Sequence, residues 1–149
     1  MNKNSFIPPL VSVIITAHNR PKYLKKTLQS IVNQTYTNIE ILVVDDGSTP
    51  NNSMQIEEIT QSYKKCKYFY KTNTGQPDSR NYGIQKAKGD YIAFCDDDDF
   101  WVLNKLKKQV FFLEQNENYG VIAGCVEYVD KNGVLMNYTN CKKNFGTDF

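Results

Sequence analysis

Three short apolar runs, each followed at once by polar or charged side chains, constrain the fold of this chain most strongly. The runs are 10–16 (LVSVIIT), 39–44 (IEILVV) and 91–95 (YIAFC). The first is rich in β-branched residues and the last is too short for a helix, so all three are interpreted as buried strands. Segments with helical spacing separate them, which predicts an α/β domain with a largely parallel sheet.

The segments between these strands place apolar residues at helical spacing. Helices are expected at about 21–33, 53–64, 78–86 and 103–113. Pro21 suits the first position of a helix, Asp78 can cap the third helix, and Gly89 is placed to end it. The remaining strands are expected at 67–70 and, as a hairpin about a turn at 131–133, at 121–129 and 134–136.

The polar clusters after the strands indicate a binding site. They are His18–Asn19–Arg20, Asp45–Asp46 and the four carboxylates of 96–99. Parallel strands bring all three clusters to one edge of the sheet, where α/β proteins bind their ligands. Four adjacent acids raise each other's pKa unless a positive group lies among them, and in proteins that group is usually Mg²⁺ or Mn²⁺. Taken alone, the acidic run is equally compatible with a solvated turn.

Composition narrows the class of protein. The 149 residues suffice for one domain, and the net charge of +2 is too small to indicate nucleic-acid binding. The lysine clusters flank amphipathic segments and are interpreted as solvated faces, with weak attraction to an anionic membrane surface left open. No signal-peptide core or membrane-spanning run is found, so a cytoplasmic protein is expected, with peripheral attachment to the inner face of a membrane as the alternative. The four cysteines have no CxxC spacing, and neither a disulfide framework nor a zinc site is expected.

Three segments, in matching order and spacing, resemble the donor half of the family-2 glycosyltransferases. They are SVIITAHNR, IEILVVDDGST and NTGQPDSRNYGIQKAKGDYIAFCDDDDFW. The similarity runs from about Val11 to about Val134. It implies the GT-A fold, a Rossmann-like three-layer α/β sandwich with a mostly parallel central sheet. The donor domain is then expected at 10–138, after a flexible lead at 1–9 and before a tail at 139–149 that would open a missing acceptor half.

The resemblance implies a nucleotide-sugar site. Ala17 and Asn19 in the turn after the first strand, together with Asp45, would hold the nucleobase and ribose, since a carboxylate there can accept the uracil N3–H. Arg80 would contact the nucleotide, and Arg20 is a further partner for phosphate or base.

The acidic run would supply the D-x-D motif of the family. Asp96, Asp97 and Asp98 form it, the first acid binding ribose and Asp98 ligating the Mn²⁺ or Mg²⁺ that bridges the diphosphate. Asp99 is expected to support the loop, with Trp101 packed beneath it.

Other residues of these segments receive structural interpretations. Asn81 and Gly83 would shape the start of the helix that carries Arg80. His18 is interpreted as a structural hydrogen-bonding residue. Asp46 either supports the nucleotide site from behind or belongs only to the turn. The stretch 76–79 (QPDS) departs from the small residues usual in the family and would adjust this loop.

The implied activity is metal-dependent, inverting transfer of a sugar from a nucleoside diphosphate, expected to be UDP, to a glycan or lipid-linked acceptor in polysaccharide biosynthesis. The family's catalytic base lies in a second half, beyond Phe149, and neither Asp130 nor Asp148 matches a catalytic position. The catalytic residue therefore stays unknown. Apolar surface left where that half would pack predicts self-association.

Other classes of protein compete with this interpretation. The chain could be a shortened module that binds nucleotide sugar and transfers nothing. A signalling receiver shares ILVVDD but would open with that strand, and a haloacid-dehalogenase-type phosphatase would open with its D-x-D strand. Neither a G-x-x-x-x-G-K-[ST] nor a G-x-G-x-x-G motif occurs, which excludes a P-loop and a dinucleotide fingerprint.

Overall fold

A computed structural model describes residues 8–130 and 134–139. The chain divides into two compact units, Met1–Leu103 and Asn104–Phe149. The expected turn at 131–133 lies outside the described residues, as does nearly all of the expected lead and tail. The expected donor domain at 10–138 therefore stays a prediction in its exact bounds.

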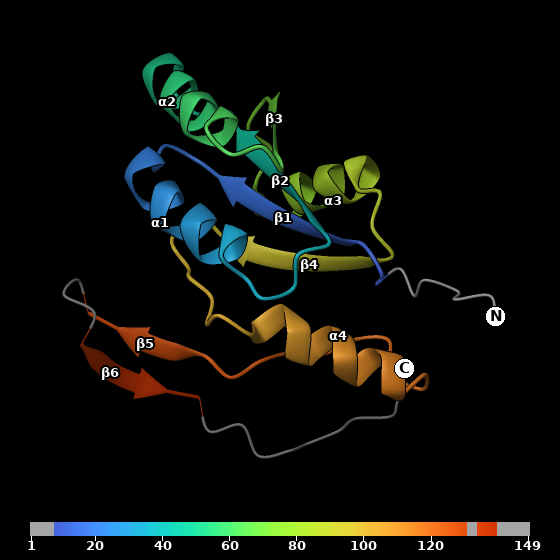
Figure 1. The fold of residues 1–149 in the computed structure, drawn as a ribbon. Coiled ribbons are helices and arrows are strands. Elements are labelled where there is room, and N and C mark those ends of the chain that lie inside the picture. The colour runs from blue at the N-terminus through green and yellow to red at the C-terminus, as the bar shows by residue number, and fades with distance from the viewer. Residues whose placement is uncertain (1–7, 131–133, 140–149) are drawn as a thin grey trace. The chain divides into compact units, whose positions relative to one another are not determined.

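The first unit contains a four-stranded parallel sheet. Its strands are β1 (Val11–Ala17), β2 (Ile39–Asp46), β3 (Cys66–Lys71) and β4 (Tyr91–Asp96). They lie in the order β3-β2-β1-β4, and every neighbouring pair is parallel (Figure 1). The predicted α/β class with a mostly parallel central sheet is confirmed, and all four carboxyl ends lie at the same edge.

Three helices connect these strands. They are α1 (Pro21–Val32), α2 (Pro50–Gln61) and α3 (Gln76–Lys86). Figure 1 shows α1 and α2 on one side of the sheet and α3 on the other, as right-handed crossovers require when the strand order reverses direction.

Two predicted helix ends are corrected. The third helix begins at Gln76 with Gly75 at its N-cap, so Asp78 lies in the first turn and does not cap it. Its C-cap is Ala87. Gly89 lies beyond the helix end, at a place where a Cβ would come within 2.6 Å of the backbone nitrogen of Ser12. Close approach to β1 therefore explains this glycine better than helix termination does.

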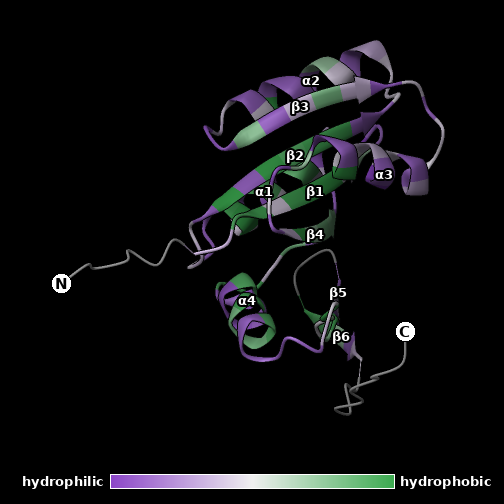
Figure 2. Ribbon diagram, turned by 90° about the vertical axis from the view of Figure 1, so that its right-hand side faces the viewer, coloured by the Kyte–Doolittle hydropathy of each residue, from purple (hydrophilic) through white to green (hydrophobic). Residues whose placement is uncertain are grey.

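The core is built on the two central strands. Every residue of β1 and β2 is buried, and Figure 2 shows both strands as largely hydrophobic. The α1 helix buries Leu24, Leu28 and Ile31 completely. On the other face α3 approaches closely at Gly83, where a Cβ would lie 2.5 Å from Cγ2 of Ile14. Gly83 is thus a packing position inside α3, which corrects the expectation that it shapes the helix start.

The second unit contains α4 (Lys105–Gln115) and an antiparallel pair, β5 (Glu127–Val129) and β6 (Leu135–Tyr138). The expected hairpin strands are therefore present, the first of them shorter than predicted. Asp130 closes the pair, because its N–H donates to the carbonyl of Val134 and its carboxylate accepts the Val134 N–H. Cys125 is disulfide-bonded, although the spacing of the cysteines gave no sign of a disulfide framework.

No helix among the described residues is long and apolar enough to cross a membrane.

Candidate functional site

The polar clusters that follow β1, β2 and β4 are hydrogen-bonded to one another at the carboxyl edge of the sheet. The backbone N–H of Asn19 donates to Oγ of Ser48 over 2.8 Å, which joins the turn after β1 to the turn after β2. The N–H of His18 points to Oδ2 of Asp97 at 3.4 Å, which joins it to the loop after β4. The strand ends thus form one polar surface.

Asn19 sets the shape of the turn after β1. Its φ of 56° is in the left-handed region, which Asn tolerates better than most residues. Its Oδ1 accepts the N–H of Thr49 at 2.8 Å and the amide of Asn52 at 3.0 Å. The preceding Ala17 is buried at the end of β1. Asn19 therefore holds two loops together, and its side-chain oxygen is engaged within the protein.

His18 also makes contacts within this surface. Its Nδ1 lies 2.9 Å from the carbonyl oxygen of Asp46. Because a carbonyl only accepts, Nδ1 carries the proton, and Nε2 is left to accept from the amide of Asn19 at 2.9 Å. These contacts fit the structural role expected for this histidine.

Asp45 is fully buried at the end of β2. One carboxylate oxygen accepts the N–H of Ser48 at 2.9 Å, and the other accepts the hydroxyls of Ser53 at 2.5 Å and Tyr68 at 2.9 Å. Burial, together with the carboxylate of Asp45, raises the pKa of Tyr68 to about 12, so this phenol stays a donor. A nucleobase would reach Asp45 only if one of these side chains gave way.

Asp46 fixes the loop between β3 and α3. Its carboxylate accepts Nζ of Lys71 at 2.8 Å and the backbone N–H groups of Thr74 at 3.0 Å and Gly75 at 2.9 Å. Burial acts to raise the pKa of Asp46, but the hydrogen bonds and charge of Lys71, with the Thr74 N–H, hold it below its ordinary value. These contacts fix the loop, and both interpretations left open by the sequence, support from behind the site and a role in the turn alone, stay predictions.

Arg80 meets the acidic run at its first residue. Its Nη2 lies 2.8 Å from Oδ1 of Asp96, which also accepts the side-chain amide of Gln76 at 2.8 Å. The guanidinium lies over the ring of Phe94, 5.7 Å from its centroid. Arg80 and Asp96 are each partly exposed, so both are accessible to a ligand at the strand end.

Arg20 bridges the next two acids. Its Nη2 lies 2.5 Å from Oδ1 of Asp97 and its Nη1 lies 2.5 Å from Oδ2 of Asp98. Asp97 is fully buried, and burial raises its pKa to about 6 against the opposing charge of Arg20. Burial and the charges of its acidic neighbours also raise the pKa of Asp99. Two arginines therefore neutralise part of the negative charge of this loop.

The loop 97–103, here called the acidic loop, is attached to α1 and the turn after it by hydrogen bonds. The carbonyl of Asp97 accepts the hydroxyl of the buried Thr27 at 2.8 Å. Oγ of Ser30 accepts the N–H of Trp101 at 3.1 Å. The carbonyls of 102 and 103 accept the side-chain amide of Gln34 and the N–H of Thr35. The position of the carboxylates is thus set by the helix rather than by the loop alone.

The donor set fits a hard divalent cation shared with phosphate. Among residues 8–130 and 134–139, no group of three His, Cys, Asp or Glu side chains is arranged to hold a metal by itself. Mg²⁺ and Mn²⁺ are commonly held by one or two carboxylates plus substrate phosphates. Asp98, whose side chain is 41% exposed, and Asp97, whose buried Oδ1 lies 2.5 Å from the guanidinium of Arg20, supply that number of ligands.

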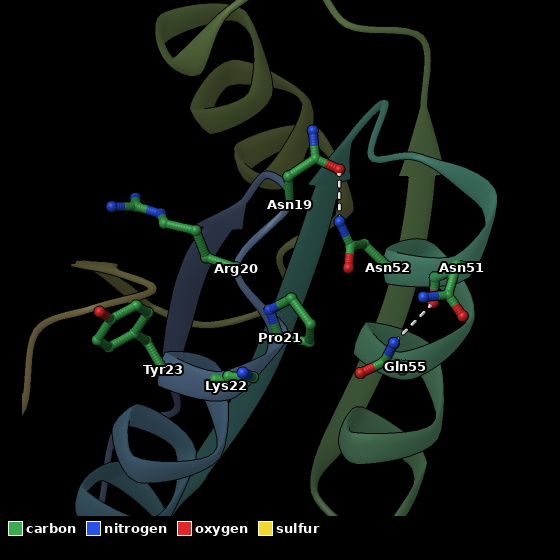
Figure 3. Close-up of a pocket in the computed structure, with 8 residues that line it drawn as sticks. All are labelled: Asn19, Arg20, Pro21, Lys22, Tyr23, Asn51, Asn52 and Gln55. Atoms are coloured by element: carbon green, nitrogen blue, oxygen red, sulfur yellow. Dashed lines mark hydrogen bonds between the residues drawn. The ribbon is translucent and has the colours of Figure 1, made fainter.

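A pocket opens beside this surface, between the first turns of α1 and α2 (Figure 3). Its volume is about 350 Å³. Several of the residues that line it carry side-chain amides: Asn19, Arg20, Pro21, Lys22, Tyr23, Asn51, Asn52 and Gln55. In Figure 3 the side chain of Arg20 extends away from the α2 residues, in keeping with its contacts to the acids.

Sequence reasoning missed several side chains of the surface. Lys71 and Gln76 each bind one of its carboxylates, and Thr27 holds the acidic loop. Lys71 ends β3, so the rule that pointed to the other strand ends would have found it. Thr27 gives no such signal, because it lies in the middle of an amphipathic helix.

Comparison with known families and proteins gives a consistent result. The model of the family described as "Glycosyl transferase family 2" matches residues 12–147. A Haemophilus influenzae protein named as an uncharacterized glycosyltransferase is 44% identical over 121 residues, which are 78% of this chain and 48% of that protein. A Rickettsia bellii protein of the same description is 40% identical over 137 residues, 91% of this chain and 20% of that protein. The chain thus spans half or less of the length of these relatives.

Solved structures with the same arrangement of elements include S. aureus TarS in complex with UDP. That chain is 32% identical, with a TM-score of 0.64, over 72% of this chain and 32% of that one. The mannosyltransferase PcManGT of Pyrobaculum calidifontis, in complex with GDP-Man and Mn²⁺, has a TM-score of 0.65 over 85% of this chain and 37% of that one. At 22% identity, this second likeness concerns the fold alone.

Proposed function

This chain belongs to glycosyltransferase family 2 and has the GT-A fold, and we propose that it is the donor-binding half of a metal-dependent, inverting enzyme. The donor is a nucleoside-diphosphate sugar, and UDP is the favoured nucleotide. The observation that carries the proposal is the meeting of Arg20, Arg80 and the acids 96–98 at one edge of the parallel sheet. TarS, which shares the fold at 32% identity, is solved with UDP and with UDP-GlcNAc.

Each residue of the surface has a task in this proposal. Asp96 accepts ribose hydroxyls, and Arg80 turns from Asp96 to the nucleotide. Asp98, assisted by Asp97, holds Mn²⁺ or Mg²⁺. When bound, such a cation acts as a Lewis acid that neutralises charge on the leaving diphosphate. The loop that carries these acids is held by α1, so they are pre-positioned before the donor arrives.

The turn after β1 would form the wall of the nucleobase site. Ala17 and Asn19 shape this wall, and Asp45 lies behind it. For Asp45 to accept a uracil N3–H, Ser53 or Tyr68 must move aside, since both now donate to its carboxylate. The uracil N3–H would then take the lone-pair site that the displaced hydroxyl leaves.

The rest of the reaction is assigned to residues outside this surface. We propose a glycan or lipid-linked acceptor, as in polysaccharide biosynthesis, and a catalytic base supplied by a part of the enzyme that this donor surface does not include. A cytoplasmic location with peripheral membrane contact fits a lipid-linked acceptor. The competing proposal is a module that binds nucleotide sugar without transfer, which is favoured only by the lack of an assigned base.

Nucleotide titration separates these proposals from a structural fold without a site. UDP and GDP are titrated into the folded protein with Mn²⁺ present, and then into Arg80→Ala and Lys86→Ala, which remove one positive charge each from the same helix. We expect UDP to bind more tightly than GDP, and only Arg80→Ala to weaken binding, by about tenfold for a charged hydrogen bond. Absence of nucleotide binding to the folded wild type would refute the proposal.

A further inference from the structure

Arg20 occupies the two carboxylates that the proposed cation needs. Its Nη1 lies 2.5 Å from Oδ2 of Asp98 and its Nη2 lies 2.5 Å from Oδ1 of Asp97. Each guanidinium nitrogen thus contacts a different carboxylate, so the group bridges the pair as a cation would. Asp96 is engaged separately by Arg80. Within the acidic run, Arg20 is therefore the counter-charge shared by the pair.

The contacts that Arg20 makes with the two carboxylates are of a kind that a cation can replace. Oδ1 of Asp97 is buried and has no hydrogen bond, although the guanidinium lies within ion-pair distance of it. The contact therefore lacks the fork-like geometry that makes arginine–carboxylate pairs strong. Both Arg20 and Asp98 have side chains more than two-fifths exposed, and water screens a pair of that kind. Displacement of the guanidinium from Asp98 is accordingly inexpensive, whereas the fully buried Asp97 keeps a counter-charge only if the incoming cation takes the place of Arg20.

A pocket beside the acidic run offers space for the displaced side chain of Arg20. Arg20 lines the 350 Å³ pocket between α1 and α2, and the amide side chains of Asn51 and Gln55 line its opposite wall (Figure 3). The backbone at Asn19 is fixed by hydrogen bonds to the turn after β2. The side chain can therefore swing without movement of the turn that carries it.

We propose that Arg20 is an internal counter-ion that excludes free cations from Asp97 and Asp98, and that it transfers to the donor diphosphate when nucleotide and cation arrive together. This inference rests on the proposed function, because the diphosphate is the ligand that releases the arginine. It makes Arg20 a positioning residue that couples cation binding to nucleotide binding. Cation alone is bound weakly, and cation with nucleotide is bound well.

The test measures Mn²⁺ binding without nucleotide. The signal of free Mn²⁺ in electron paramagnetic resonance is followed for the wild type, for Arg20→Gln and for Lys22→Gln, a matched loss of one positive charge on the neighbouring pocket wall. We expect Arg20→Gln to bind Mn²⁺ about fivefold more tightly than the wild type, the effect of releasing an exposed ion pair. Lys22→Gln should stay within about twofold of the wild type, since the charge it removes is screened by solvent.

Two further variants make the result decisive. Arg20→Gln/Asp98→Asn should lose the gain, because the freed carboxylate is then absent. Arg20→Lys keeps one point charge that can pair with one carboxylate only, and an intermediate gain is expected; it replaces Arg20→Gln if that variant does not fold. Mn²⁺ affinity that is unchanged or weaker in the folded arginine variants would overturn the inference, since Arg20 would then be assembling the site rather than blocking it.

Failure of this inference can be told apart from failure of the proposed function. UDP is titrated into the wild type with saturating Mn²⁺ in parallel. UDP binding with no gain in Mn²⁺ affinity for Arg20→Gln would overturn the counter-ion role alone. A gain in Mn²⁺ affinity without any UDP binding would refute the nucleotide site, and with it the transfer of Arg20 to a diphosphate.

Discussion

At the scale of single residues, the carboxylates of the surface differ in the partners that the protein itself supplies to them. Asp45 and Asp46 are adjacent, buried and satisfied by neighbouring donors. Asp96 and Asp98 are partly exposed and held by arginines. The residue types and strand ends could be predicted from the sequence. The division of tasks between Asp45 and Asp46 could not, because it depends on donors from β3 and α2.

Acid should remove the contribution of Asp46 to stability. The pKa of Asp46 is lowered in the folded protein, so the unfolded chain binds more protons around its ordinary pKa of 3.8. Stability from this group is thus fully present above that pH and is lost as pH falls through the lower folded value. Asp46→Asn should therefore lower the free energy of unfolding more at pH 7 than at pH 3, as measured by urea denaturation. Equal losses at both values would contradict the role given to Lys71 and the loop N–H groups.

At the scale of elements, the strands and helices were predictable because their apolar residues repeat with the correct period. The helix start at Gln76 was not, since the N-cap Gly75 adopts a φ of 95° that depends on the loop held by Asp46. The roles of Gly83 and Gly89 were also missed. Both are required by the close approach of another element, which local sequence does not reveal.

Gly83 tests how closely α3 packs on the sheet. Gly83→Ala places a Cβ 2.5 Å from Cγ2 of Ile14, and overpacking of this kind costs about 1–3 kcal/mol. The gain in helix propensity, about 1 kcal/mol, opposes it, so we expect a net loss of stability in thermal or urea unfolding.

The double variant Gly83→Ala/Ile14→Ala provides the control. Ile14→Ala alone leaves a cavity, and the methyl group that Gly83→Ala adds should then be tolerated better than in the wild type. A favourable coupling energy in this double-mutant cycle is expected. Simple additivity would show that the two side chains do not meet.

Thr27 tests whether α1 positions the acidic loop. Thr27→Val removes the donor to the carbonyl of Asp97 and leaves that buried acceptor unpaired, which costs about 1–3 kcal/mol. Metal-dependent UDP binding should weaken as well, as measured by calorimetry. Thr60→Val is the matched control, because that buried hydroxyl donates within its own helix, to Ile56. Loss of stability without loss of UDP binding in Thr27→Val would contradict the positioning role.

At the scale of the whole molecule, the resemblance found in the sequence led to the correct family and fold. The division into two compact units after Leu103 falls inside the segment 10–138, whose assignment as one donor domain stays a prediction. The chain spans half or less of its relatives, so the acceptor and the catalytic base remain proposals.

Self-association is the prediction that belongs to this scale. Strand β4 is an outer strand of the sheet in the first unit, and its Ile92 and Phe94 are 37% and 45% exposed. Exposed apolar groups on an edge strand favour pairing with another copy. Light scattering should therefore show a mass that rises with concentration, and Phe94→Lys should reduce the rise. A constant monomer mass at high concentration would count against it.

The central claim is that the strand ends bind a nucleoside diphosphate together with a cation, and calorimetric titration of UDP tests it most directly. UDP is titrated with and without Mn²⁺ into the wild type and into Asp98→Asn, which keeps the shape of the side chain and removes its charge. We predict binding that requires Mn²⁺ in the wild type and is lost in the variant. Equal UDP binding by both proteins, or none by a folded wild type, would contradict the claim.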